Sequence, residues 1–195
     1  MKSLKQYIEN HTNESLSDGE GVLSDPERDN RIIETWVKEN YRFNRQLKIN
    51  DDLTVDCPGS VGVKKQNITS LTNGLFRWGE IKGDFDCSNC FNLTSLEGSP
   101  EEVSGDFDCY NCGELKSLEG APKSIGGTFD CSHCKNITSL EGAPESIGGA
   151  FVCSFCKSLK SLKDGPKRVK TDLYCYSCPD LVITDSDHRK YNIRS

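Results

Sequence analysis

Five Cys-x-x-Cys pairs are the residues of this chain whose type and spacing could do chemistry. Two successive pairs have the spacing of a four-cysteine zinc site, and a single pair at the start of a helix can act as a redox centre. The pairs are Cys87/Cys90, Cys109/Cys112, Cys131/Cys134, Cys153/Cys156 and Cys175/Cys178, and each follows the previous one by 22 residues. A constant period is typical of a stacked repeat protein, so the role of the cysteines depends on the repeat.

A stacked repeat places equivalent residues one above another, and this placement favours some roles of the cysteines over others. Four thiolates bound to one zinc ion converge to about 2.3 Å from it, whereas equivalent residues of stacked strands stay about 4.8 Å apart in parallel rows. We therefore expect the cysteines to pack in the core, without a cofactor. Zinc remains an alternative, with Cys87, Cys90, Cys109, Cys112, Cys131, Cys134, Cys153 and Cys156 as its ligands. Redox catalysis is disfavoured because it needs an exposed thiolate at a helix start.

The residues around the cysteines keep the same period and indicate the fold. Phe85, Phe107, Phe129, Phe151 and Leu173 stand two residues before each first cysteine, and leucine or isoleucine follows each second cysteine by three residues. The segment FxCxxCxxLxxL matches the leucine-rich-repeat pattern. We expect an α/β solenoid, a leucine-rich-repeat horseshoe or arc. Short parallel strands would line its concave face, and its convex side would be rich in loops or turns.

The sequence outside the regular units predicts how the two ends are closed. Residues 1–44 are expected to form a helical appendage with a linker, with helices near Met1–Asn10 and over 24–41; Ile33, Trp36, Val37 and Tyr41 fall on one face of the second helix. Residues 45–80 are a degenerate capping repeat, with Trp78 as an apolar plug over the first coil. Residues 81–183 hold the regular repeats. Residues 184–195 are expected to cap the last coil as a short strand or turn.

The units SLEGSPEEVSGDFDCSNC and SLEGAPKSIGGTFDCSHC, together with the leading MKSLKQYI, resemble a known group of proteins. They are similar to the short leucine-rich-repeat proteins that tailed bacteriophages and prophages encode. The resemblance covers residues 53–183 and is specific to the SLEGxPxxVGGxFxC unit. Many such proteins have Asn at the position of the second cysteine. The resemblance implies a solenoid used for recognition and implies no catalytic activity.

Composition and charge restrict the class of partner. The chain has 195 residues and a net charge of −6, which argues against nucleic acid because a phosphate backbone needs a basic face. The first ten residues lack the apolar core of a signal peptide, and no apolar run is long enough to span a membrane. We expect a protein of the bacterial cytoplasm or of the virion, not a secreted one. The eleven cysteines are then expected to stay reduced.

Candidate binding residues are the outward positions of the predicted strands, because the concave face of a solenoid is its usual binding surface. They are Asp84, Asp86, Ser88, Asp106, Asp108, Tyr110, Asp130, Ser132, Asp172, Tyr174 and Tyr176. Acidic rows suit a basic partner, and tyrosine is a frequent interface anchor. We therefore expect a non-catalytic module that binds a host or phage protein. A zinc-binding repeat protein and a structural virion component remain alternatives. An enzyme is the least favoured class, because His133, one of three histidines, is best interpreted as a surface rung.

Overall fold

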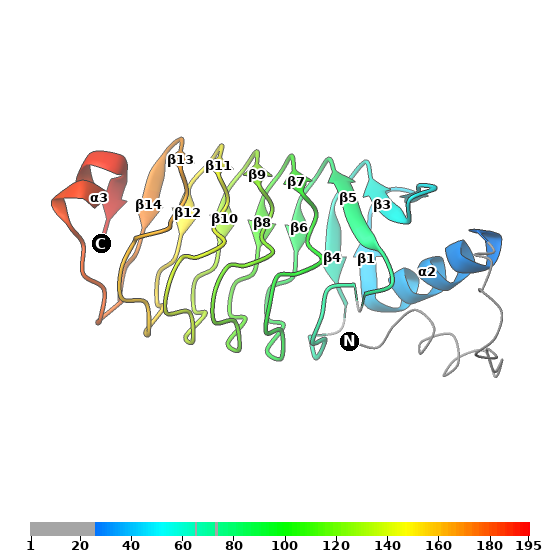
Figure 1. Ribbon diagram of the computed structural model, residues 1–195, viewed down its shortest axis with the longest axis horizontal. Coiled ribbons are helices and arrows are strands. Elements are labelled where there is room, and N and C mark those ends of the chain that lie inside the picture. The colour runs from blue at the N-terminus through cyan, green and yellow to red at the C-terminus, as the bar shows by residue number, and fades with distance from the viewer. Residues whose placement is uncertain (1–25, 65, 73) are drawn as a thin grey trace, which may run out of the picture.

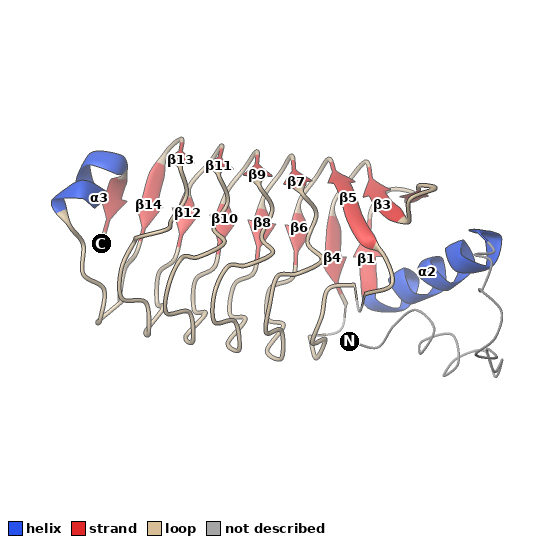
Figure 2. Ribbon diagram, in the orientation of Figure 1, coloured by secondary structure: helices blue, strands red, loops and turns tan. Residues whose placement is uncertain are grey.

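The computed structural model describes residues 26–64, 66–72 and 74–195. They form a β-solenoid of about six turns, whose coils stack in a nearly straight row along the long axis of the molecule (Figure 1). Helices occur only near the two ends of this row, and the described residues between them are strands, turns and loops (Figure 2). The sequence therefore predicted the solenoid correctly. The coils themselves are built from short strands and turns, and the strands of each coil pair with those of its neighbours.

Sheet A contains the strands that the cysteine repeat predicts. Its strands, in spatial order, are β1(Tyr41–Phe43), β4(Val61–Val63), β6(Phe85–Asp86), β8(Phe107–Asp108), β10(Phe129–Asp130), β12(Phe151–Val152), β14(Asp172–Tyr174) and β15(Asn192–Arg194). All neighbours are parallel except β1 and β4. Equivalent residues pair from coil to coil, so each phenylalanine lies beside the next.

Sheet B is a second ladder on the part of each coil where the sequence analysis placed loops or turns. Its strands, in spatial order, are β13(Arg168–Val169), β11(Ser146–Ile147), β9(Ser124–Ile125), β7(Glu102–Val103), β5(Arg77–Ile81), β3(Thr54–Cys57) and β2(Lys48–Ile49). They are parallel except for β2. The prediction of a side rich in loops or turns is thus incomplete, because this side also contains two-residue strands that hydrogen-bond from coil to coil. A short corner such as Ser104–Asp106 joins the two sheets of one coil.

The core lies between these sheets and the turn-rich side of each coil. The predicted inward residues are buried: Phe85, Cys87, Cys90, Leu93 and Leu96 have no exposed surface, and their equivalents in the next three coils are at most 1% exposed. The phenylalanine rings of neighbouring coils lie 5.4–5.6 Å apart between centroids. Gly120 shows how closely the coils approach at the turn, because a Cβ atom there would lie 2.4 Å from the backbone nitrogen of Glu97, and its φ is +86°. Stacking therefore restricts both side chains and backbone.

The N-terminal end is closed by aromatic packing. The helix predicted over 24–41 is confirmed as α2(Pro26–Asn40), with Ile33, Trp36 and Val37 buried, while Tyr41 begins β1. Trp78 is 1% exposed and its ring lies 5.0 Å from that of Tyr41, as expected for an apolar plug. The helix predicted near Met1–Asn10 lies outside the described residues.

The C-terminal end is closed by the last strand and a short helix. The strand predicted there is β15, which pairs with β14, and α3(Asp185–Lys190) precedes it. Tyr191, between these two elements, is buried, and its hydroxyl donates to the carbonyl oxygen of Pro166 at 2.7 Å. The last coil thus has an apolar cover.

Candidate interaction surface

A row of carboxylates runs across the outward face of sheet A. Asp86, Asp108 and Asp130 follow their buried phenylalanines on β6, β8 and β10, and they pair in register from strand to strand. Strand geometry turns these side chains outward, because successive residues of a strand point to opposite faces. The structure therefore brings together three of the aspartates that the sequence analysis selected. In the next two coils the row continues as Val152 and Tyr174, so its acidic part ends after three rungs.

One oxygen of each carboxylate in this row is used by the adjacent turn. The Oδ1 atoms of Asp86, Asp108 and Asp130 accept the backbone N–H groups two residues later, at 2.7–2.9 Å. The hydroxyls of Ser88 and Ser132 donate to the same oxygens of Asp86 and Asp130. Ser132 is only 5% exposed, so it supports the turn and offers little surface to a partner. The second oxygen of each carboxylate is left for other contacts.

The two ends of sheet A carry their own arginines. Arg42, on β1, donates to Oδ2 of Asp86 at 3.0 Å, and Arg194, on β15, donates to Oδ1 of Asp172 at 3.0 Å. Within the described part of the chain, no ion pair reaches Asp108 or Asp130. Asn192 also donates to Asp172, and Tyr174 donates to its Oδ2 at 3.4 Å. Asp172 and Tyr174 are therefore engaged with each other and with the C-terminal strand.

The middle of the acidic row is electrostatically unfavourable. Burial raises the pKa of Asp108 to about 6, and although the N–H of Tyr110 acts against this rise, the charges of Asp130, Asp86 and Asp106 add to it. Like charges at strand spacing disfavour ionisation, and no described cation pairs with Asp108 or Asp130. A cation brought to Asp108 would relieve this repulsion.

Asp84 and Asp106 were also selected from the sequence, but they lie at the corner between the sheets. Asp84 Oδ1 accepts the backbone N–H of Asp106 at 2.9 Å, and Asp106 Oδ1 accepts that of Thr128 at 2.6 Å. Each aspartate thus joins its coil to the next one. This role explains the residue type without a partner, although both side chains remain exposed.

Aromatic side chains lie beside the acidic row, in the turn that follows each strand. The ring of His133 lies 5.1 Å from that of Tyr110 and 4.4 Å from that of Phe155. Phe155 and Tyr176 are 41% and 44% exposed, unusually open for large apolar residues. His133 is thus a stacked surface rung, as expected. Tyr110 and Tyr176 were predicted from the sequence as binding residues, whereas Phe155 was not, although its place between two cysteines matches that of His133.

The residues directly before the second cysteines form a second row in the same turn, and they share one backbone conformation. Asn89, Asn111, His133, Phe155 and Ser177 all have φ between +55° and +61°. Asparagine tolerates this left-handed conformation well, and Asn111 donates its side-chain amide to Asn89 Oδ1 at 3.0 Å. Phenylalanine does not tolerate it well, so Phe155 keeps an exposed ring at a conformational cost.

The cysteines have a structural arrangement. Cys112, Cys134, Cys156 and Cys178 each donate their thiol to the backbone carbonyl of the first cysteine of the preceding coil, at 3.2 Å. Burial raises the pKa of Cys109 and Cys153 well above the usual value, so these thiols stay protonated. In residues 26–64, 66–72 and 74–195, no three His, Cys, Asp or Glu side chains are placed to bind one metal ion. The second cysteine of each of these pairs therefore joins its coil to the preceding one.

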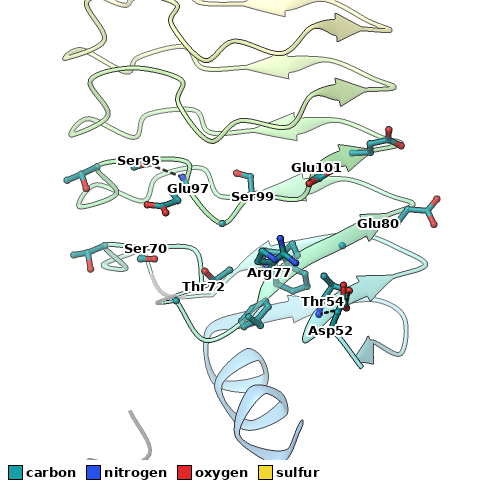
Figure 3. A pocket seen from close by; sticks show the side chains of 18 residues that line it. Asp52, Thr54, Ser70, Thr72, Arg77, Glu80, Ser95, Glu97, Ser99 and Glu101 are labelled. Atoms are coloured by element: carbon teal, nitrogen blue, oxygen red, sulfur yellow. Dashed lines mark hydrogen bonds between the residues drawn. The ribbon is translucent and has the colours of Figure 1, made fainter. Parts of the chain in front are cut away.

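A groove of about 1030 Å³ opens on the side of sheet B, over the irregular first coils (Figure 3). Arg77 lies in it between Thr72 and Thr54, while Glu97 and Glu101 come from the next coil. Five carboxylate residues and one arginine line the groove, which makes it acidic. No pattern in the sequence predicts it, because it forms where residues 64–76 depart from the regular repeat.

Comparison with known proteins leaves function to be argued from this geometry. No protein-family model, no curated protein and no solved structure matches the chain. None of the helices among the described residues is long and apolar enough to cross a membrane.

Proposed function

We propose that this protein is a non-catalytic binding module whose sheet A face takes a basic segment of a partner protein. The observation that carries the proposal is the in-register row of Asp86, Asp108 and Asp130, of which only Asp86 has an arginine among the described residues. Ionised carboxylates at strand spacing repel one another, and a lysine or arginine from a partner would offset that repulsion.

The contact between Arg42 and Asp86 supports arginine as the matching group. The guanidinium reaches the second carboxylate oxygen, while the first oxygen keeps its hydrogen bond to the turn. The same outward oxygens of Asp108 and Asp130 are free of described cations. A partner arginine could therefore repeat this contact without disturbing the coil.

The aromatic side chains beside the row supply a second kind of contact. Phe155 and Tyr176 expose their rings, and a guanidinium stacks favourably on an aromatic face. A segment that crosses the coils would meet carboxylates first and aromatic rings towards the C-terminal end. Such a mixture of charge and aromatic anchors is typical of protein interfaces.

We further propose that the coils are of the leucine-rich-repeat type and that the protein derives from a tailed bacteriophage or prophage, acting in the host cytoplasm or in the virion. This proposal rests on the SLEGxPxxVGGxFxC units. Sheet A would then correspond to the concave strand face of that class, and the partner would be a host or phage protein.

The experiment is a binding screen on an array of peptides with graded lysine and arginine content. Asp108→Asn with Asp130→Asn removes two charges but keeps the oxygen that each turn uses. Glu114→Gln with Glu119→Gln removes two charges from exposed positions outside the row, and it serves as the matched control. We expect the wild type and the control to bind basic peptides, and the first variant to lose them. Equal binding by all three proteins would place the site elsewhere, and no preference for basic peptides would refute a basic partner.

A further inference from the structure

Charged side chains on the outward face of sheet B follow one another from coil to coil in an order that is complementary to its own reverse. Glu102, Ser124, Ser146 and Arg168 pair in register across β7, β9, β11 and β13. Glu80 on β5 pairs with Glu102 and precedes these four rungs, and its carboxylate lies 3.7 Å from the ammonium group of Lys82. The four-rung row itself is negative at one end, small and neutral in the middle, and positive at the other end. When it is read from the opposite end, the sign of each charge is reversed.

The neighbouring row has the same property. Glu101, Lys123, Glu145 and Lys167 precede the four strands, and each charge is opposite to the next. Lys123 pairs with Glu101 at 3.5 Å, and Lys167 pairs with Glu145 at 3.1 Å, all four side chains being largely exposed. Reversal of this row again changes the sign at every position. Coil stacking would be satisfied if charges simply alternated in sign from coil to coil. It does not require two adjacent rows that both reverse their signs on inversion.

A row that reverses its sign on inversion is complementary to itself in an antiparallel arrangement. Closed homodimers use one patch of surface on both subunits, related by a two-fold axis. With that axis parallel to the strands and between β9 and β11, each row faces its own reversed copy. Glu102 would then face Arg168 of the partner subunit, and Glu101 would face Lys167 of the partner subunit.

We infer that the protein forms an antiparallel, two-fold homodimer through sheet B. The nearly straight stacking of the coils lets corresponding rows stay opposite each other along the face (Figure 1). Sheet A lies around the corner, so the dimer leaves the proposed partner site open on both subunits. The inference is independent of that proposed function, because it uses other residues and another face.

The residues at the ends of the two rows favour a second copy over a solvated face. Glu102 and Arg168 take part in no ion pair within the described residues, although both are exposed. Two coils lie between them, so they cannot satisfy each other within one chain. In the dimer each meets an opposite charge, and the contact occurs twice because of the two-fold axis.

The groove adds a third match at the same end of the face. Glu97 lies on its lining, and its equivalent in the last regular coil is Lys163. The same two-fold axis places Lys163 of the partner subunit over Glu97, next to the contact of Glu101. The acidic groove of each subunit would thus receive the basic last coil of the other. Glu119 and Glu141, in the middle of that row, would face each other and limit the affinity.

The test uses two charge reversals, Glu102→Arg and Arg168→Glu, with sedimentation velocity as the readout. We expect the wild type to dimerise at low ionic strength and to dissociate as salt screens the charges. Each variant alone should weaken the dimer by about tenfold or more, because two attractive contacts become repulsive. An equimolar mixture of the two variants should recover the dimer. In the heterodimer the two introduced side chains face each other in one contact and the two native side chains in the other, so both contacts are attractive.

Recovery on mixing is the decisive result, because a partner of any other kind would not produce it. Glu114→Arg makes the same charge change on another exposed part of the chain and should leave the dimer unchanged. Glu101→Lys and Lys167→Glu form a second pair with the same expected behaviour. The inference is overturned if the wild type is monomeric at low salt, or if the mixtures remain as dissociated as the single variants. Unfolding curves of each variant separate these results from loss of fold.

Discussion

Asp108 offers the sharpest test of the acidic row, because its charge should oppose folding at neutral pH. Asp108→Asn keeps an oxygen for the N–H of Tyr110 but removes the charge between Asp86 and Asp130. We therefore expect the variant to be more stable than the wild type at pH 7. Removal of a hydrogen-bonded native aspartate more often destabilises a protein, so the direction of the effect is informative.

The size of the effect follows from the pKa of Asp108. Its value of about 6 in the folded protein lies above the ordinary value near 3.8. The folded state therefore holds the proton more tightly, and its advantage is present below about pH 4 and is lost as the pH rises through 6. One pKa unit corresponds to about 1.4 kcal/mol, but the side chain is only half-buried and solvent screens its neighbours. After this discount we expect a gain of about 1 kcal/mol at pH 7.

Urea unfolding at pH 7 and at pH 4 measures this difference directly. The gain of Asp108→Asn should be present at pH 7 and should largely disappear at pH 4, where the wild-type side chain is protonated in the folded state. Asp106→Asn is the control, because that residue also accepts a backbone N–H but lies at the corner. A variant that is no more stable at pH 7, or that gains equally at both pH values, would refute the penalty that burial and the neighbouring carboxylates together place on the charge of Asp108.

Two further predictions concern the core and the cysteines. Phe129→Ala should lower the free energy of unfolding by about 3–5 kcal/mol, because the ring is fully buried between Phe107 and Phe151. Phe155→Asn should cost little, since it replaces a phenylalanine in the left-handed conformation by a residue that tolerates it. Chemical denaturation compares the two variants, and equal losses would contradict the stabilising role of the buried phenylalanine ladder. Chelator should leave the thermal midpoint unchanged, and iodoacetamide should label the buried cysteines only after unfolding, because their thiols are protonated and enclosed. A lower midpoint with released zinc would instead support the zinc alternative.

The buried ladders could be predicted from the sequence because each consists of one residue type at one position of the period. Phe85 and Cys87 recur without insertion, so their stacking required no knowledge of the turns. The acidic row followed from the same register, since Asp86 lies between two inward residues. Sheet B was harder to predict, because its strands in the regular coils are two residues long and lack the phenylalanine and cysteine ladders that mark sheet A. Their hydrogen bonds join coils that are 22 residues apart.

The first coil shows where a local pattern misleads. The segment LTVDC, 53–57, resembles the cysteine strand, yet Cys57 lies in sheet B and pairs with Ile81. The rung of sheet A is β4 instead, where Val61 pairs with Phe85. The longer first coil shifts the register, so two segments of similar sequence need not occupy the same position in their coils. For the same reason the contact of Arg42 with Asp86 could not be predicted, because β1 joins sheet A in the antiparallel direction.

The positions that depart from the repeat indicate function better than those that obey it. Stacking alone explains the phenylalanines, the cysteines and the corner aspartates, since each contacts the next coil. It does not explain why carboxylates fill three successive outward positions, nor why Phe155 takes a conformation that asparagine would adopt more readily. Both features weaken the solenoid locally: the carboxylates lie on the outward face of sheet A, and Phe155 lies in the turn that follows β12 of the same sheet. A partner that offsets the charge and covers the ring would remove both costs, so binding and stability should rise together.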